Sequence, residues 1–304
     1  RETRLMSSDD STGTDWLAIS RRNARSVQTT VGWIFWDPGA VRRYATLGLP
    51  ENLAGPLGYM AARSAPLAPA GPDAVIAAFG SISPLGIRGV FDLLGSTERF
   101  AEFWEARDEA VVSGLRDHAP DIVEPLSTLG AALWDVVERL PLVGRPFFGA
   151  HLAMPRSSDP LLSGWHAVNC LREWRGDTHW AIVVAHGLGH SEASILHNAW
   201  LGYEPDWIPR SRGTSDADLL LGYDALQRKG LARDHVVTTE GIALRQHIED
   251  ETDRLTTLPW ELLGIEMSEW FAEAFEPPCE LLLRRVDETA GPNYQPASRI
   301  RPPR

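Results

Sequence analysis

The chain has 304 residues, of which 43% are hydrophobic and 23% charged, as is usual for a folded globular protein. Its formal net charge of −12 disfavours DNA binding without excluding it, because such binding depends on Lys and Arg side chains that neutralise phosphates. The sequence has no uninterrupted apolar run long enough for a membrane helix and no N-terminal signal pattern. Cys170 and Cys279 are its only cysteines and lie far apart, so no disulfide framework is expected. We therefore expect a cytoplasmic protein that makes no membrane contact.

Helical patterning dominates the first half of the chain. A Pro- and Gly-rich connector over 65–73 interrupts it, and prolines at 72 and 84 suit the first turns of two short helices. The apolar spacing predicts helices over 20–36, 40–47, 72–79, from 84 onward, 97–118 and 121–140. We expect a loose N-terminal segment over 1–19 and a helical domain over 20–150.

Residues 151–202 are predicted to form a central group of helices rich in polar side chains. The pattern predicts a helix over 161–175 that ends at Gly176, since glycine commonly terminates helices. Asp177 is then expected to be the N-cap of a second helix, because its carboxylate can accept free backbone N–H groups of a first turn. A third helix over 191–200 follows a glycine break.

Residues 203–264 have the element order of a winged helix-turn-helix domain. A short helix over 205–210, a turn, a helix over 215–229, a β-prone stretch over 231–238 and a further helix follow one another. The predicted fold class is therefore mainly α, with a helical N-terminal and central region followed by a winged helix-turn-helix domain with a small β wing. Residues 265–304 are predicted to hold a helix end and a Pro-rich tail, which starts near Phe275.

Several long motifs are spread over most of residues 27–264. They include YMAARSAPLAPAGPDAVIAAFGSISP (59–84), GRPFFGAHLAMP (144–155) and WHAVNCLREWRGDTHWAIVVAHGL (165–188). The last resembles the WHAxxxLREhRGDxH motif of an actinobacterial family of winged-helix, MarR-like proteins. The resemblance implies a helix-turn-helix fold and suggests a transcriptional regulator, although fold alone does not define function. His186 and His190 depart from that family's usual pattern.

The polar residues around 166–179 are the main candidates for a catalytic site. His166 and Glu173 share a helix face, and the predicted corner at Gly176 would bring Asp177 and His179 towards them. An imidazole beside a carboxylate is an acid–base pair near neutral pH. The catalytic candidates are His166, Glu173, Asp177 and His179, and the ligand-binding candidates are Arg172, Arg175, Trp165, Trp174, Trp180 and His197.

Two other interpretations of these residues stay open. Arg172 and Arg175 can pair with nearby carboxylates and serve only to lock a helix corner, since buried charges need partners. A metal site would need three or more ligands on a fixed frame, whereas two glycines break the helix near His186 and His190, so no metal is predicted. No phosphate-loop, dinucleotide or nucleophile-elbow motif is present, which leaves any cofactor unknown.

The charges of the helix over 215–229 favour small-molecule binding over DNA binding. Asp216, Asp218 and Asp224 would face phosphates, and the basic Arg228 and Lys229 stand at the far end. The twelve tryptophans either fill the core or line a pocket for a flat organic ligand. We expect a protein that binds a small organic molecule, with a biosynthetic or resistance enzyme left open. The alternative is a MarR-like DNA-binding regulator with the same cluster as its effector pocket, and a homodimer is also left open.

Overall fold

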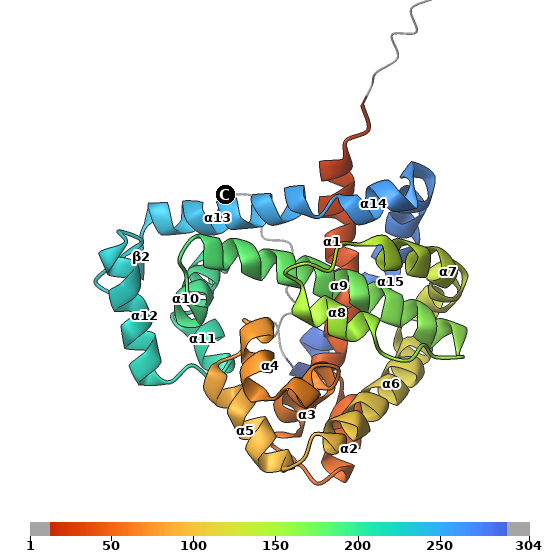
Figure 1. The fold of residues 1–304 in the computed structure, drawn as a ribbon, viewed down its shortest axis with the longest axis horizontal. Coiled ribbons are helices and arrows are strands. Elements are labelled where there is room, and N and C mark those ends of the chain that lie inside the picture. Colours follow the sequence, from red (N-terminus) through yellow and green to blue (C-terminus); the bar gives the residue numbers. More distant parts are fainter. Residues whose placement is uncertain (1–12, 291–304) are drawn as a thin grey trace, which may run out of the picture.

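The computed structural model describes residues 13–290, which form a mainly helical fold with a single two-stranded hairpin in that range (Figure 1). The N-terminal elements are α1 (Trp16–Gly32), η1 (Trp33–Trp36), α2 (Pro38–Thr46), α3 (Ala54–Ser64), η2 (Ala68–Ala70), α4 (Pro72–Phe79), α5 (Pro84–Leu94), α6 (Glu98–His118), η3 (Pro120–Ile122), α7 (Val123–Arg139) and α8 (Pro146–Leu152). The C-terminal elements are α9 (Pro160–Ala185), α10 (His190–Leu201), α11 (Trp207–Ser211), α12 (Asp216–Arg228), β1 (Ala232–Arg233), β2 (Val236–Val237), α13 (Thr239–Leu255), α14 (Leu258–Leu263) and α15 (Ile265–Ala290). None of the helices within 13–290 combines the length and apolar character that crossing a membrane requires.

Many helix starts follow directly from local sequence. Pro72 and Pro84 open α4 and α5, as predicted, because the fixed φ of proline suits a first helical turn and its missing N–H is not needed there. The Asp37 side chain caps α2 by accepting from the backbone N–H groups of Gly39 and Ala40. Local capping chemistry therefore fixes where these short helices begin.

Helix α9 corrects the predicted break at Gly176. The helix runs without interruption from Pro160 to Ala185, and Asp177 instead caps α8 by accepting from the backbone N–H of Phe148 at 2.9 Å. Packing explains the difference, because α9 is the central helix against which α1, α7, α8 and α13 all pack (Figure 1). Burying α9 outweighs the roughly 1 kcal/mol that a glycine costs in a helix interior.

Helix α15 corrects the predicted start of the tail near Phe275. The helix continues to Ala290 through Pro277 and Pro278, although each proline removes one helix hydrogen bond. The side chains of Phe275 and Leu282 are fully buried in the main core, and this burial offsets the lost hydrogen bonds. The rest of the predicted tail, 291–304, and residues 1–12 of the predicted N-terminal segment lie outside the described residues.

Two hydrophobic clusters form the interior, and α9 contributes to both. The larger cluster contains Leu161 to Trp174 of α9 together with side chains from α1 to α8, α14 and α15. The smaller cluster contains Ile182 and Val183 from the end of α9, with side chains from α10, α12, β1 and α13. The α7–α9 contact is very close, because a Cβ atom at Gly164 would lie 2.0 Å from the Leu126 carbonyl oxygen. One continuous helix therefore joins the two clusters.

The segment 203–264 shows the predicted order of short helix, turn, helix, hairpin and helix. It forms the left side and the top of the molecule in Figure 1. The hairpin pairs Ala232 with Val237, and its two-residue loop of Asp234 and His235 has φ values of 48° and 60°. Two left-handed residues in a two-residue loop match the right-handed twist of the flanking strands.

Candidate functional site

A cavity of about 580 Å³ lies where the two hydrophobic clusters meet, a volume typical of small-molecule sites. Its walls come from elements far apart in the sequence, namely α1, η1, α3, α4, α9, α10, α11 and α13. One part of the wall is aromatic and consists of Phe35, Trp36, Tyr59, Phe79, Trp180, Trp200, Tyr203 and Trp207.

The backbone of Gly80 makes room for one of these aromatic rings. A Cβ atom at Gly80 would come within 2.2 Å of the Trp180 ring, and the φ of 61° at this residue also favours glycine. Trp180 on α9 therefore lies directly against the end of α4.

Arginine is the dominant charged residue of the cavity. Seven guanidinium groups line it, from Arg21, Arg25, Arg63, Arg172, Arg175, Arg212 and Arg245. Six of them are paired with carboxylates, and those carboxylates are Glu173, Glu249, Asp250, Asp253 and Glu280. The partner of Arg25 is Glu280 on α15, and Arg21 pairs with Asp250 on α13.

Glu173 holds two of these arginines from behind the cavity wall. Its carboxylate accepts from Arg63 at 2.9 and 2.7 Å and from Arg172 at 2.6 Å. Burial alone would favour the neutral acid, but the two guanidinium groups hold the pKa of Glu173 well below its usual range. Glu173 is therefore an ionised structural partner of the arginines at neutral pH.

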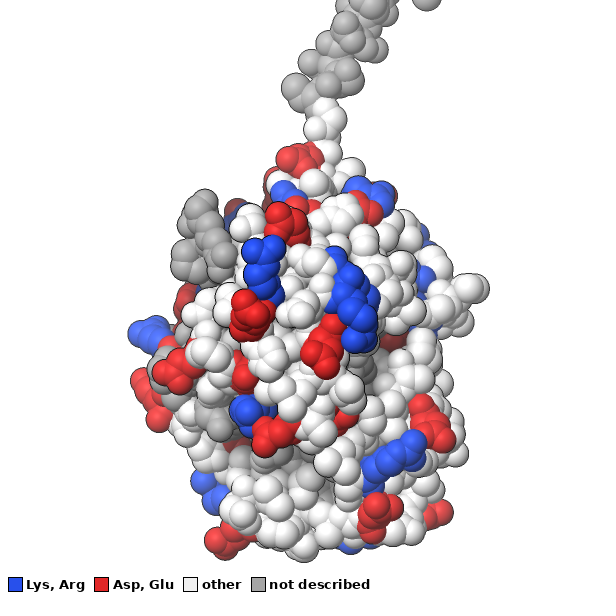
Figure 2. All heavy atoms as spheres, turned by 90° about the vertical axis from the view of Figure 1, so that its left-hand side faces the viewer, with Lys and Arg blue, Asp and Glu red and all other residues white. Residues whose placement is uncertain are grey.

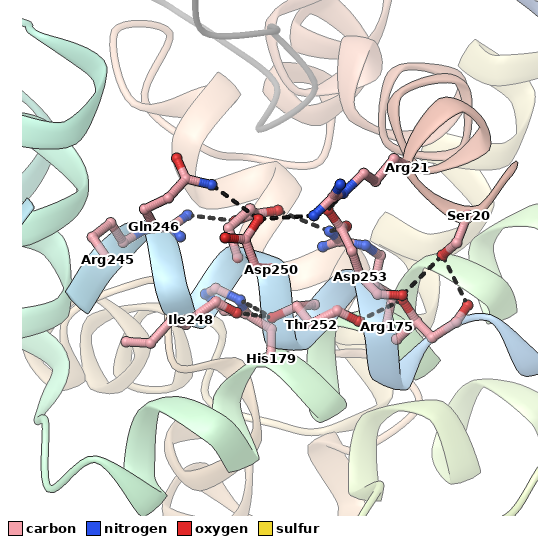
Figure 3. Close-up of polar contacts among 12 residues, drawn as sticks. Ser20, Arg21, Arg175, His179, Arg245, Gln246, Ile248, Asp250, Thr252 and Asp253 are labelled. Atoms are coloured by element: carbon pink, nitrogen blue, oxygen red, sulfur yellow. Dashed lines mark hydrogen bonds and ion pairs between the residues drawn. The ribbon is translucent and has the colours of Figure 1, made fainter. Parts of the chain in front are cut away.

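A second network joins α9 to α13 (Figure 3). Arg175 donates to Glu249 at 2.8 Å and to Asp253 at 2.6 Å, and Arg245 donates to the other oxygen of Glu249 at 2.8 Å. His179 Nδ1 lies 3.0 Å from the hydroxyl oxygen of Thr252, which itself donates to the Ile248 carbonyl. The Thr252 oxygen therefore accepts from Nδ1–H, and the other ring nitrogen of His179 carries no proton.

Arg212 differs from the other arginines of the cavity. It lies in the turn between α11 and α12, and its guanidinium has no carboxylate partner within residues 13–290. Burial, together with the positive charges of Arg245 and Arg63, lowers the pKa of Arg212 to about 10, so it stays protonated at neutral pH. The turn is fixed from outside by a hydrogen bond of 3.0 Å from the Ser83 N–H to the Arg212 carbonyl.

The structure does not gather the four residues predicted to be catalytic in one site. His166 and His179 are thirteen positions apart on α9, which places them on roughly opposite sides of an unbroken helix. His166 lies 2.8 Å from Asp108 and borders a small void away from the large cavity, whereas His179 lines the large cavity. Glu173 and Asp177 bind Arg63 and the backbone of α8 respectively, and no hydrogen bond between described residues joins any two of the four. The predicted helix corner that would unite them is absent, and their acid–base role stays a prediction.

The predicted ligand-binding residues divide into two groups. Arg172, Arg175, Trp180 and His197 line the large cavity. The indoles of Trp165 and Trp174 lie in the main core, where they donate to the carbonyls of Thr30 at 2.8 Å and Pro141 at 3.2 Å.

Sequence reasoning did not identify Arg63, Arg212 and Arg245 as residues of the site. They belong to three segments with no shared motif, and only tertiary packing brings them to one cavity. The Ser-Arg-Gly turn at 211–213 is recognisable in the sequence, but nothing in the sequence indicates that the side chain of Arg212 lines a cavity.

The histidines considered for a metal have other contacts. His190 Nδ1 lies 2.9 Å from the Gly80 carbonyl, and Nε2 lies 3.1 Å from the Thr214 hydroxyl, so the ring joins α10 to α4 and to the start of α12. The ring of His186 lies edge-on to that of His247 at 5.5 Å. Within the described part of the chain, no three His, Cys, Asp or Glu side chains gather as metal ligands would.

A comparison with known protein families gives a match over most of the chain. The pattern of a helix-turn-helix family matches residues 20–287. The chain belongs to this helix-turn-helix family. The match includes every residue that lines the large cavity, so the cavity lies inside the family's region and not in an added segment. Neither the curated proteins nor the solved structures contain a match to the chain.

Proposed function

We propose that this helix-turn-helix family protein binds a small organic molecule in the large cavity. The observation that carries the proposal is a space of about 580 Å³ with one aromatic wall and a set of polar groups. Such a combination favours an organic ligand, because flat rings stack on the aromatic side chains while a few polar groups fix the orientation.

The protonation state of His179 favours binding over proton transfer. Burial lowers the pKa of His179 to about 3, with the nearby Arg245 acting in the same direction. A general base works best with a pKa near the working pH, and His179 is far too weak a base for that at pH 7. It can accept a hydrogen bond from a ligand through its unprotonated nitrogen.

A neutral fluorescent probe tests the proposal. N-phenyl-1-naphthylamine brightens in apolar sites, and we expect it to bind with one site per chain. Ala24 faces the cavity from α1, so Ala24→Phe fills part of the space and is expected to weaken binding at least about tenfold. Ala18 on the same helix is exposed, and Ala18→Phe is the matched control. A probe that binds Ala24→Phe and the natural chain equally would not occupy the cavity.

A DNA-binding regulator is the second candidate function, and membership of a helix-turn-helix family favours it. In that role α11 and α12 would be the helix-turn-helix pair of a winged-helix arrangement, with β1 and β2 as the wing. This candidate function includes a homodimer, because two DNA half-sites would need two copies of the domain, and a cytoplasmic location.

The charges on the surface of α12 count against strong DNA binding. Asp216, Asp218 and Asp224 are exposed on this helix, and Lys229 is engaged by Glu192 and the Gly187 carbonyl. On the face that carries α12 and the hairpin, acidic and basic side chains are interspersed (Figure 2). The test is the affinity for the protein's own upstream DNA at increasing salt. A steep loss of affinity with salt would support the regulator, and no binding at low salt would eliminate it.

A further inference from the structure

We infer that the ligand is an aromatic organic anion whose acidic group is bound by Arg212. This inference rests on the proposed binding function and adds the chemical class of the ligand. It also assigns the anchoring residue, which lies in the turn of the helix-turn-helix segment between α11 and α12.

The charges around the cavity leave room for an anion. Seven guanidinium groups line the cavity, whereas five carboxylates pair with six of them, so positive charge is in excess and is concentrated at Arg212. The positive charges of Arg63 and Arg245 are near enough to repel the guanidinium of Arg212. A bound carboxylate, sulfonate or phosphate ester would supply the missing negative charge, and its paired oxygens match the fork of a guanidinium.

Several buried donors of the residues that line the cavity also have no acceptor in the described protein, and two of them matter here. They are the hydroxyl of Ser194 on α10 and Nη1 of Arg245 on α13, in side chains that are 1% and 6% exposed. Buried donors are rarely left unpaired, because each one costs free energy when no acceptor is present. The oxygens of an acidic group supply acceptors that these donors lack.

The aromatic part of the wall indicates the body of the ligand. The guanidinium of Arg245 lies 4.5 Å above the ring of Trp200, and that of Arg63 lies 4.2 Å above the ring of Phe79. The positive and aromatic parts of the wall therefore adjoin each other. A flat ring system that bears one acidic group can contact both parts at once.

Two matched dyes test the inference. 8-Anilinonaphthalene-1-sulfonate carries the same rings as N-phenyl-1-naphthylamine plus one sulfonate, so the pair isolates the contribution of the negative charge. With the natural chain we expect the sulfonate dye to bind at least about tenfold more tightly than the neutral dye. In Arg212→Gln we expect the two affinities to become equal within about threefold, through loss of sulfonate-dye affinity alone.

The control variant is Arg210→Gln. Arg210 is two residues from Arg212, near the end of α11, but it is exposed, pairs with Asp216 at 2.6 Å and does not line the cavity, so both affinities should be unchanged. Unchanged affinity for the neutral dye in Arg212→Gln shows that the variant is folded. Ser194→Ala, expected to weaken only the sulfonate dye about threefold, is the second test should Arg212→Gln not fold.

The possible outcomes separate this inference from the proposed function. Equal affinity of the natural chain for both dyes, or unchanged sulfonate-dye affinity in both Arg212→Gln and Ser194→Ala, overturns the anionic ligand and leaves the cavity as a binding site. Failure of both dyes to bind overturns the proposed function itself.

Discussion

At the scale of single residues, the position of Arg212 lowers the stability of the ligand-free protein. The side chain of Arg212 is partly buried, has no carboxylate partner among residues 13–290 and lies near the positive charges of Arg63 and Arg245. Removing an unpaired buried charge stabilises a fold, whereas removing one member of a buried pair destabilises it.

We therefore expect Arg212→Gln to raise the free energy of unfolding of the ligand-free protein by about 1 kcal/mol, as measured by urea denaturation. Arg175→Gln is the contrast, because it leaves Glu249 and Asp253 without their main partner and is expected to cost about 3 kcal/mol. If Arg212→Gln destabilised the protein as much as Arg175→Gln, Arg212 would have an anionic partner after all.

The ionisation of Asp177 makes the stability of the protein depend on pH. Burial raises the pKa of this carboxyl to about 7, although the N–H of Phe148 opposes the shift. The folded state therefore keeps a proton that the unfolded state loses near pH 4. The contribution of Asp177 to stability falls as the pH rises from about 4 to 7 and stays at its minimum above that.

Asp177→Asn removes the ionisation and keeps an oxygen that can accept from Phe148. We expect this variant to be more stable than the natural chain at pH 8, by on the order of 2 kcal/mol, and to equal it near pH 4. Urea denaturation at pH 4, 6 and 8 measures the difference. If the free energies of unfolding of the variant and the natural chain differed by the same amount at all three pH values, the raised pKa would be contradicted.

At the scale of elements, the two glycines of α9 have opposite roles. At Gly176 the helix is regular, and a new Cβ atom would meet only an oxygen of Glu173, at 3.9 Å. At Gly164 a new Cβ atom would lie 2.0 Å from the Leu126 carbonyl oxygen of α7, which cannot move without shifting that helix.

We expect Gly176→Ala to stabilise the protein by about 0.5–1 kcal/mol, because alanine loses less backbone entropy in a helix. Gly164→Ala is expected to destabilise it by at least about 2 kcal/mol through overpacking. Thermal unfolding of the two variants beside the natural chain gives both values. Destabilisation by Gly176→Ala would mean that the helix is interrupted there in solution.

The same elements show which parts of the fold the sequence predicts. Pro72, Pro84 and the hairpin at 231–238 follow local rules, and their structures agree with prediction. The break at Gly176 was wrong because a local stop signal competes with burial of the whole of α9, and that burial depends on distant helices. The cavity follows the same logic, since Trp180 lies in a recognisable motif whereas Arg212 becomes a cavity residue only through packing.

At the scale of the whole molecule, the cavity lies between a large and a small hydrophobic cluster. The small cluster holds α10, α12 and the hairpin, and the cavity separates part of it from α1 and α3. A molecule that fills the cavity would contact Arg212 of the helix-turn-helix segment, Ser194 of α10 and Arg63 of α3. Binding would therefore stabilise the helix-turn-helix segment against local opening, since a ligand stabilises the state to which it binds.

Hydrogen exchange followed by mass spectrometry tests this coupling. Without ligand we expect amides of α10, α11 and α12 to exchange faster than those of α7, because the small cluster buries fewer side chains. Saturating 8-anilinonaphthalene-1-sulfonate should slow exchange in α10, α11 and the turn at 212–214, and leave α6 and α7 unchanged. In Arg212→Gln the dye should slow exchange at the turn much less at the same dye concentration. Slower exchange confined to α6 and α7, or an equal change in natural chain and variant, would show that the cavity is not coupled to the helix-turn-helix segment through Arg212.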